Sequence, residues 1–278
     1  MGRDPGLRVM AGVGAYNEER TIEEILARFE PGVVDEVVAI DDGATDGTPE
    51  IIARLGVSCI RHETNQGVGA GIKSAYRYAQ AHGHNILVLV AGNGKDDPRE
   101  IPRLLAPILE GDYDYVQGSR YLPGGSSPNQ PLQRTILVRL LALAYRLLTG
   151  FPSTDPSNGF RAYKLSLLDD ERINVWQDWL NGYELEHYLN YLVLKLGYRV
   201  VEVPVSKTYP AERGVRYSHV RPFRDWWKSL RRRSHKSTCD WQRFYTRLAR
   251  RWMPALRVMH PYPEHRLCVT TCGRSPVR

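Results

Sequence analysis

Three polar stretches follow apolar runs in the first hundred residues and carry the groups best suited to chemistry. They are Ala15-Tyr16-Asn17-Glu18-Glu19, Asp41-Asp42-Gly43-Ala44-Thr45-Asp46-Gly47-Thr48 and Ala91-Gly92-Asn93-Gly94-Lys95-Asp96-Asp97-Pro98. Carboxylates at the end of a strand can bind a nucleotide base, a ribose hydroxyl or a metal ion. We interpret Asp46 and Thr48 as a turn and helix cap. Asp41 and Asp42 are expected to have no role in packing, which favours a binding role.

The elements that must position these groups alternate between short apolar strands and amphipathic helices. Strands are expected at residues 7–15, 33–40, 57–61, 86–90, 115–118 and 199–205. Helices are expected from residue 17 onward and at 48–55, 69–82, 98–110, 132–149 and 184–196, with a loop over 122–131. This alternation predicts an α/β fold with a Rossmann-like, mostly parallel sheet and helices on both faces. Ligands of such sheets bind beyond the carboxyl ends of the strands, where the polar stretches lie.

The net charge of +7 is divided unevenly along the chain. Residues 213–278 hold 17 Lys and Arg against 3 Asp and Glu, whereas residues 1–212 hold 21 against 28. We therefore expect a catalytic domain over 1–210 and a basic, aromatic, helical extension over 211–278. The extension either docks on an anionic membrane surface or packs its aromatic residues on the domain.

Composition excludes several classes of protein. The hydrophobic content of 42% and charged content of 25% are those of a globular chain. No apolar run reaches the length of a membrane-spanning helix, and the first residues do not resemble a signal peptide. The protein is expected to be cytoplasmic, and a peripheral position at the membrane stays open. A nucleic-acid partner is not expected, because the body of the chain is acidic.

Six motifs in order resemble those of the family-2 glycosyltransferases, which have the GT-A fold, and most closely the branch of dolichol- and polyprenyl-phosphate mannose synthases. Besides the first two polar stretches, they are Asn65-Gln66-Gly67-Val68-Gly69, Gly118-Ser119-Arg120-Tyr121, the segment from Asp155 to Tyr163 and the segment from Gly197 to Val205. The resemblance implies transfer of a sugar, with inversion, from a nucleotide diphosphate sugar. The acceptor would be a polyprenyl phosphate or the hydroxyl of a small molecule.

The resemblance also implies roles for individual residues. The nucleotide base and ribose would be held by Tyr16, Glu18 and Asp42, and the donor phosphates would be approached by Arg120, Arg213 and Arg216. A hydroxyl acceptor would need a base, for which the candidates are Asp155, Glu184 and Glu186. An acceptor that is already an anionic phosphate would need none. Replacing Asp42 or Asp155 by Ala is expected to abolish transfer without unfolding the protein.

The chain departs from the family at the Asp-x-Asp metal motif. The aligned residues are Ala91, Gly92 and Asn93, followed by Gly94 and Lys95. One hypothesis is that Lys95 and arginines neutralise the diphosphate with little or no metal. Another is that Mg²⁺ or Mn²⁺ binds through Asn93 and a shifted Asp96, although hard cations prefer charged oxygens.

Two further readings concern the function as a whole. The chain could be a catalytically degenerate protein that binds nucleotide sugars, because both motif carboxylates are missing. It could also be a soluble glycosyltransferase that acts on a natural product or a free sugar. The sequence leaves both open.

Overall fold

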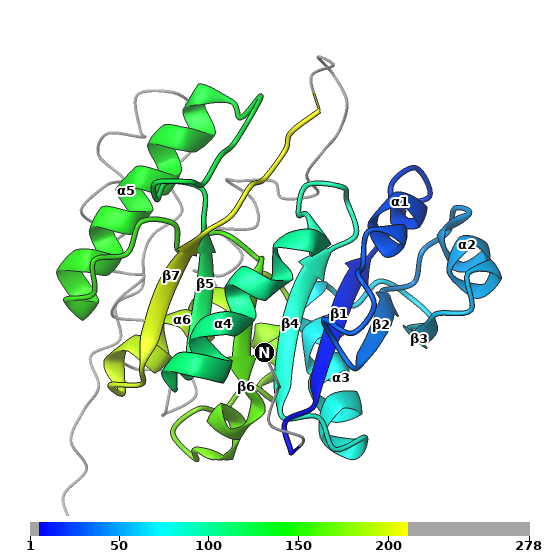
Figure 1. Cartoon of the computed structure of the whole chain (residues 1–278), viewed down its shortest axis with the longest axis horizontal. Coiled ribbons are helices and arrows are strands. Elements are labelled where there is room, and N and C mark those ends of the chain that lie inside the picture. The colour runs from blue at the N-terminus through cyan, green and yellow to red at the C-terminus, as the bar shows by residue number, and fades with distance from the viewer. Residues whose placement is uncertain (1–5, 211–278) are drawn as a thin grey trace, which may run out of the picture. The chain divides into compact units, whose positions relative to one another are not determined.

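The computed structural model describes residues 6–210, which form a seven-stranded sheet with helices around it (Figure 1). The strands are β1 (Val9–Ala15), β2 (Glu36–Asp41), β3 (Ser58–Arg61), β4 (Ile86–Ala91), β5 (Tyr115–Ser119), β6 (Arg161–Lys164) and β7 (Val200–Pro204). Their order across the sheet is β3-β2-β1-β4-β6-β5-β7. All neighbours are parallel except β6, which runs antiparallel to β4 and β5. The predicted α/β class and mostly parallel sheet are confirmed.

Helices cover both faces of this sheet. They are α1 (Ile22–Ala27), α2 (Thr48–Arg54), α3 (Val68–Ala81), α4 (Ile101–Gly111), α5 (Leu132–Thr149) and α6 (Glu184–Lys195). Side chains alternate between the two faces along a strand. Val9 and Val13 of β1 share one buried core with residues of α1, α2 and α4, whereas Gly12 faces Ala75 of α3 on the other side. In Figure 1, α4 crosses in front of the sheet and α3 lies behind it.

Three elements differ from those expected. The helix expected from residue 17 onward begins at Ile22, as α1. Residues 161–164 form β6 in the middle of the sheet, although no strand was predicted there, because a run with a cation at each end lacks an apolar pattern. The helix expected over 98–110 begins as a 3₁₀ turn at Pro98–Glu100, where the Asp97 side chain accepts from the N–H of Arg99. The regular helix follows as α4. The predicted extension over 211–278 lies outside the described residues.

Candidate functional site

The carboxyl ends of β1, β2 and β4 bring most of the predicted donor-site residues to one edge of the sheet. Ala15 pairs with Asp41 across β1 and β2, and Gly14 pairs with Ala91 across β1 and β4. The segments that follow these strands are therefore neighbours. Among the predicted residues at this edge, the half-buried ones are Tyr16, Glu18 and Asn93. The buried ones are Asp42 and Lys95.

Asp42 is held inside the fold by three contacts. Its Oδ1 accepts from the N–H of Gln66 at 2.9 Å and lies 2.7 Å from His62 Nδ1, while Oδ2 accepts from the N–H of Gly67 at 2.8 Å. Gly67 has a φ of +102°, and a Cβ there would lie 2.4 Å from the carbonyl oxygen of Asn181. The Asp42 carboxylate thus fixes a tight loop. The expectation that Asp42 has no role in packing is wrong, and its contact with a base or ribose stays a prediction.

Glu18 and Lys95 interact electrostatically at the same edge. Burial raises the pKa of Glu18 to about 7, against the attraction of Lys95. Burial lowers the pKa of Lys95 to about 7, and repulsion from Lys207 and Arg134 adds to this effect. Both side chains therefore change charge near neutral pH. A bound diphosphate would favour the protonated, cationic form of Lys95.

The donor atoms after β4 do not fit a divalent cation. Asp96 accepts from the N–H of Ala91 at 3.0 Å and forms a buried ion pair with Lys207. Asn93 offers one neutral oxygen, which lies 3.4 Å from the backbone nitrogen of Lys95. Residues 6–210 contain no group of three or more His, Cys, Asp or Glu side chains that could hold a metal ion. Because Mg²⁺ and Mn²⁺ prefer charged oxygens, this geometry gives no support to a site built from Asn93 and Asp96.

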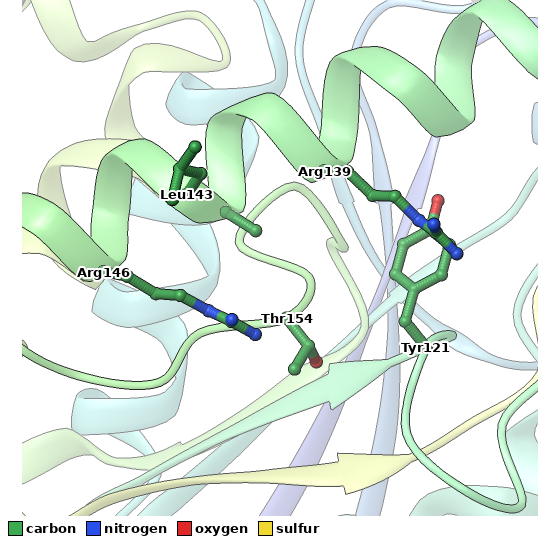
Figure 2. A pocket seen from close by; sticks show the side chains of 6 residues that line it. Tyr121, Arg139, Leu143, Arg146 and Thr154 are labelled. Atoms are coloured by element: carbon green, nitrogen blue, oxygen red, sulfur yellow. The ribbon is translucent and has the colours of Figure 1, made fainter.

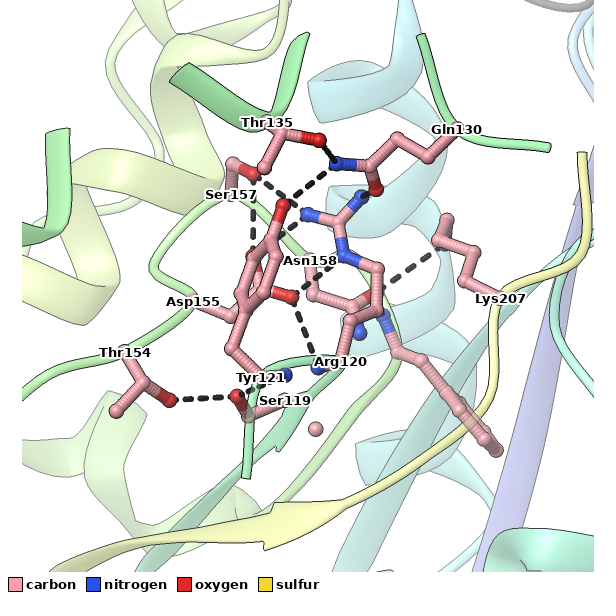
Figure 3. Close-up of polar contacts among 12 residues, drawn as sticks. Ser119, Arg120, Tyr121, Gln130, Thr135, Thr154, Asp155, Ser157, Asn158 and Lys207 are labelled. Atoms are coloured by element: carbon pink, nitrogen blue, oxygen red, sulfur yellow. Dashed lines mark hydrogen bonds and ion pairs between the residues drawn. The ribbon is translucent and has the colours of Figure 1, made fainter. Parts of the chain in front are cut away.

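Arg120 and Asp155 form a bidentate ion pair beyond the end of β5 (Figure 3). Nε and Nη2 of Arg120 each lie 2.6 Å from a carboxylate oxygen of Asp155. Nη1 donates to Tyr209 Oη at 2.6 Å and to Gln130 Oε1 at 3.1 Å, and Nη2 also donates to Ser157 Oγ at 3.0 Å. Burial works against the charge of Arg120, but the bonds and charge of Asp155 outweigh it and raise the pKa of the guanidinium. In this arrangement every guanidinium nitrogen of Arg120 has a protein partner.

A pocket of ≈ 330 Å³ opens beside this ion pair (Figure 2). It is lined by Tyr121, Arg139, Ala142, Leu143, Arg146 and Thr154. Tyr121 and Thr154 are the chain neighbours of Arg120 and Asp155. Figure 2 shows Arg139 and Arg146 projecting from α5 toward Tyr121 and Thr154. The pocket therefore combines two cations with an apolar wall, a lining suited to an anionic group that carries an apolar chain.

Tyr209 is in contact with cations from both the Arg120–Asp155 pair and the donor edge of the sheet. The Arg120 guanidinium bonds to its hydroxyl, while Lys95 Nζ and Arg134 Cζ lie 5.9 Å and 5.7 Å from the centroid of its ring. Arg134 Nε is buried and has no hydrogen-bond partner among the described residues. Arg134, Lys207 and Tyr209 were not among the residues predicted for the site. They belong to no motif, and only the fold brings them to the ends of β4 and β5.

The remaining predicted residues lie farther along the chain. Glu184 is the first residue of α6 and is half-buried. A Cβ on Gly182 would lie 2.2 Å from its Oε2, so its carboxylate folds back over the segment that contacts Gly67. Glu186 lies 3.3 Å from Arg161. Glu184 thus stays a candidate base near the loop that Asp42 fixes. The predicted phosphate-binding residues Arg213 and Arg216 lie outside the described residues.

Comparison with known proteins identifies the same family that the six sequence motifs resemble. Residues 11–172 match the family described as glycosyl transferase family 2. An undecaprenyl-phosphate mannosyltransferase of Micrococcus luteus is 28% identical over 206 residues, which cover 72% of this chain and 83% of that protein. A polyprenol monophosphomannose synthase of Mycolicibacterium smegmatis is 29% identical over 211 residues, which cover 73% of this chain and 78% of that protein.

Solved structures agree on the fold. Glucosyl-3-phosphoglycerate synthase from Mycobacterium tuberculosis superimposes with a TM-score of 0.56 at 23% identity, over 74% of this chain and 73% of that one. At this identity the likeness bears on the fold alone, which is the GT-A fold. Because the family match spans more than half of the chain, the protein belongs to glycosyltransferase family 2, whose members transfer a sugar from a nucleotide diphosphate sugar to an acceptor.

Proposed function

We propose that this glycosyltransferase uses a polyprenyl phosphate as its acceptor and works as a peripheral enzyme of the cytoplasm. The names of the two bacterial relatives point to that class of acceptor. A phosphate oxygen of the acceptor attacks the anomeric carbon of the donor sugar. The bond from that carbon to the donor diphosphate breaks, and the nucleoside diphosphate leaves. A single displacement of this kind inverts the configuration at the anomeric carbon.

The choice of a phosphate acceptor is supported by the buried ion pair that Asp155 forms with Arg120. A hydroxyl acceptor must lose a proton to a base, whereas an anionic phosphate needs no base. Both carboxylate oxygens of Asp155 are taken up by Arg120, and the side chain is 0% exposed. A carboxylate held in this way is poorly placed to accept a proton from a substrate. The pair instead supports one wall of the pocket, which supplies cations for an anionic acceptor.

We assign the donor diphosphate to the cations around Tyr209. Negative charge grows on the leaving phosphate as the bond to the sugar breaks, so fixed positive groups there lower the barrier. Lys207 and Arg120 are neutralised by Asp96 and Asp155. We assign the donor phosphates to Lys95 and Arg134, which flank the ring of Tyr209. Lys95 lies two residues after Asn93, in the segment that aligns with the family's metal motif. We assign the base and ribose to Tyr16, Glu18 and Asp42, as the family motifs imply.

The function is tested with the full chain and radiolabelled sugars of UDP, GDP and dTDP. Each donor is offered undecaprenyl phosphate or a water-soluble sugar, with and without EDTA. The proposal expects label in the organic phase from one nucleotide family, with little loss in EDTA. Label that reaches only the water-soluble acceptor contradicts it and favours a soluble enzyme. Loss of all transfer in EDTA, restored by Mn²⁺, contradicts the assignment of Lys95.

One observation favours a second function, the binding of nucleotide sugars without turnover. Ala91 and Asn93 stand where the family carries its two charged metal ligands, and no acidic cluster within residues 6–210 takes their place. Calorimetric binding of a nucleotide sugar, with no transfer to either acceptor, is the result this alternative requires. An inactive Lys95→Met variant beside an active wild type would exclude it.

A further inference from the structure

Helix α5 leaves its most apolar face exposed. An amphipathic helix ordinarily buries such a face in the core. Here the side chains of Leu132, Ile136, Leu140, Leu143 and Leu147 are between 38% and 74% exposed. The helix instead packs through small or branched residues on its opposite side, including Val138 and Ala142. We call the five exposed residues the apolar stripe.

The stripe is continuous and has a basic edge. Its residues follow one another at steps of three or four, so they lie on one side of a helix that is about 27 Å long. Arg139 and Arg146 project from the flank of the stripe toward the pocket beside the Arg120–Asp155 pair (Figure 2). Arg146 is anchored by a bond from its Nε to the carbonyl oxygen of Ser153 at 2.7 Å. Apolar residues beside arginines are the pattern of helices that lie in a membrane interface.

The charge around α5 is the opposite of the charge of the rest of the body. Residues 121–154 contain three arginines and no acidic or lysine residue, although residues 1–212 as a whole have an excess of acids. An anionic surface would therefore be attracted to this face and repelled by the remainder. The side with the apolar stripe is the side that complements such a surface.

We propose that α5 is a membrane-docking helix that lies flat in the interface of an anionic phospholipid bilayer. The apolar stripe enters the acyl boundary, and Arg139 and Arg146 reach the headgroup phosphates. The pocket then opens at the level of the headgroups, where the phosphate of a lipid acceptor is found. The link to the acceptor rests on the proposed function, but docking itself does not. No helix within residues 6–210 is long and apolar enough to cross a membrane.

Other occupants fit the charges less well. The segment 213–278 carries 17 cations against 3 acids, so it would be repelled by the arginines of α5. A second copy packed symmetrically through α5 would place like arginines close to one another. An anionic bilayer satisfies the apolar stripe and its basic edge together.

Docking is tested by co-sedimentation of the full chain with vesicles that contain no polyprenyl phosphate. One set is pure phosphatidylcholine, and the other holds phosphatidylcholine and phosphatidylglycerol in a ratio of three to one. The double variant Ile136→Glu/Leu143→Glu is compared with Leu55→Glu/Gln80→Glu, which adds the same charge at exposed positions away from α5. Thermal unfolding checks that both variants fold. Hydrogen exchange of peptides over 132–149, with and without vesicles, locates the contact in the wild type.

The proposal expects binding to the anionic vesicles, added protection of α5, and a loss of at least about tenfold in partitioning for the α5 variant alone, because two charges enter the acyl boundary. Binding that is equal in both variants, without protection of α5, overturns it and points to residues 211–278. Absence of binding in the wild type also overturns it. A wild-type dimer in solution that the α5 variant abolishes would assign the stripe to a second copy. Because the vesicles hold neither donor nor acceptor, each result is independent of the transfer assay.

Discussion

Arg120 and Asp155 form an ion pair in which both side chains are wholly buried. The carboxylate also accepts from the backbone N–H of Arg120 at 3.2 Å, so the pair closes the turn after β5 as well as the wall of the pocket. A buried charge that loses its partner is much more costly than an exposed one. The pair therefore has a role in folding, which revises the expectation that Asp155 can be replaced without unfolding.

The Asp155→Asn variant should lower the free energy of unfolding by about 3–5 kcal/mol, because it leaves the Arg120 guanidinium buried without a counter-charge. Urea denaturation of the wild type and the variant measures the loss. Asp112→Asn is the matched control, since Asp112 is 75% exposed and pairs with Lys164 and Arg199 at the surface. Its cost should be far smaller, because solvent screens an exposed ion pair. Equal losses in the two variants would contradict the account of a buried pair.

Donor binding should weaken as the pH rises through the pKa of Lys95. Burial, the largest cause, lowers that pKa to about 7, so the free protein loses the positive charge above neutral pH. Above this pH, binding of a diphosphate that requires the charged form of Lys95 must be coupled to the uptake of a proton by Lys95. Its dissociation constant should rise by up to about tenfold per pH unit above that point. Titration calorimetry with the nucleoside diphosphate, in buffers on both sides of neutrality, measures the slope.

Lys95→Arg is the variant that isolates this effect. A guanidinium stays charged through the whole range, so affinity in the variant should lose its dependence on pH while binding persists. Parallel pH profiles in wild type and variant would mean that Lys95 does not meet the diphosphate.

Glu18 should make the protein less stable as the pH rises from 4.5 to about 7. Burial, the largest cause, raises its pKa from 4.5 to about 7, so in this window the folded state holds a proton that the unfolded state has lost. The stabilisation is complete below the window and disappears through it. Glu18→Gln stays neutral, so its stability relative to the wild type should increase across the window. Urea unfolding at several pH values gives the difference.

Glu23→Gln serves as the control for this slope. The hydrogen bond and charge of Arg54 lower the pKa of Glu23 below 4.5, so this residue is ionised in both states across most of the window. The difference in stability between Glu23→Gln and the wild type should therefore stay nearly constant. A rise of the same size in both variants would contradict the assignment to Glu18.

The sequence predicted the elements well and their internal contacts poorly. Strands and helices show their hydrophobic periods over a few neighbouring residues, which can be read from the sequence. The bounds of α5, for example, agree at both ends with those expected. The strand β6 was missed because its stability comes from pairing with β4 and β5 and from the buried contacts of Arg161, including one to Tyr115 Oη at 2.7 Å. Neither cause leaves a hydrophobic period in four residues.

The site shows the same limit. Motif acids could be located from the sequence, but their partners could not. Asp41 accepts from the N–H of Ala44 at 2.8 Å, so it too has a role within the fold that its position after a strand did not reveal. Likewise, Lys207 follows β7 and reaches Asp96 only because β7 returns to the ends of the other strands. Contacts between residues far apart in the chain depend on topology, which motifs alone do not encode.

The pocket beside α5 leads to the last prediction, which concerns the acceptor. Arg139→Gln/Arg146→Gln should raise the KM for a polyprenyl phosphate by about tenfold or more, because each guanidinium can make charge-assisted hydrogen bonds to a phosphate. The KM for the donor and kcat should change little. A short-chain acceptor in detergent keeps membrane docking out of the measurement. Arg103→Gln, on the exposed side of α4, is the control with no expected effect, and a change of the same size there, or none in the double variant, would remove the pocket as the acceptor site.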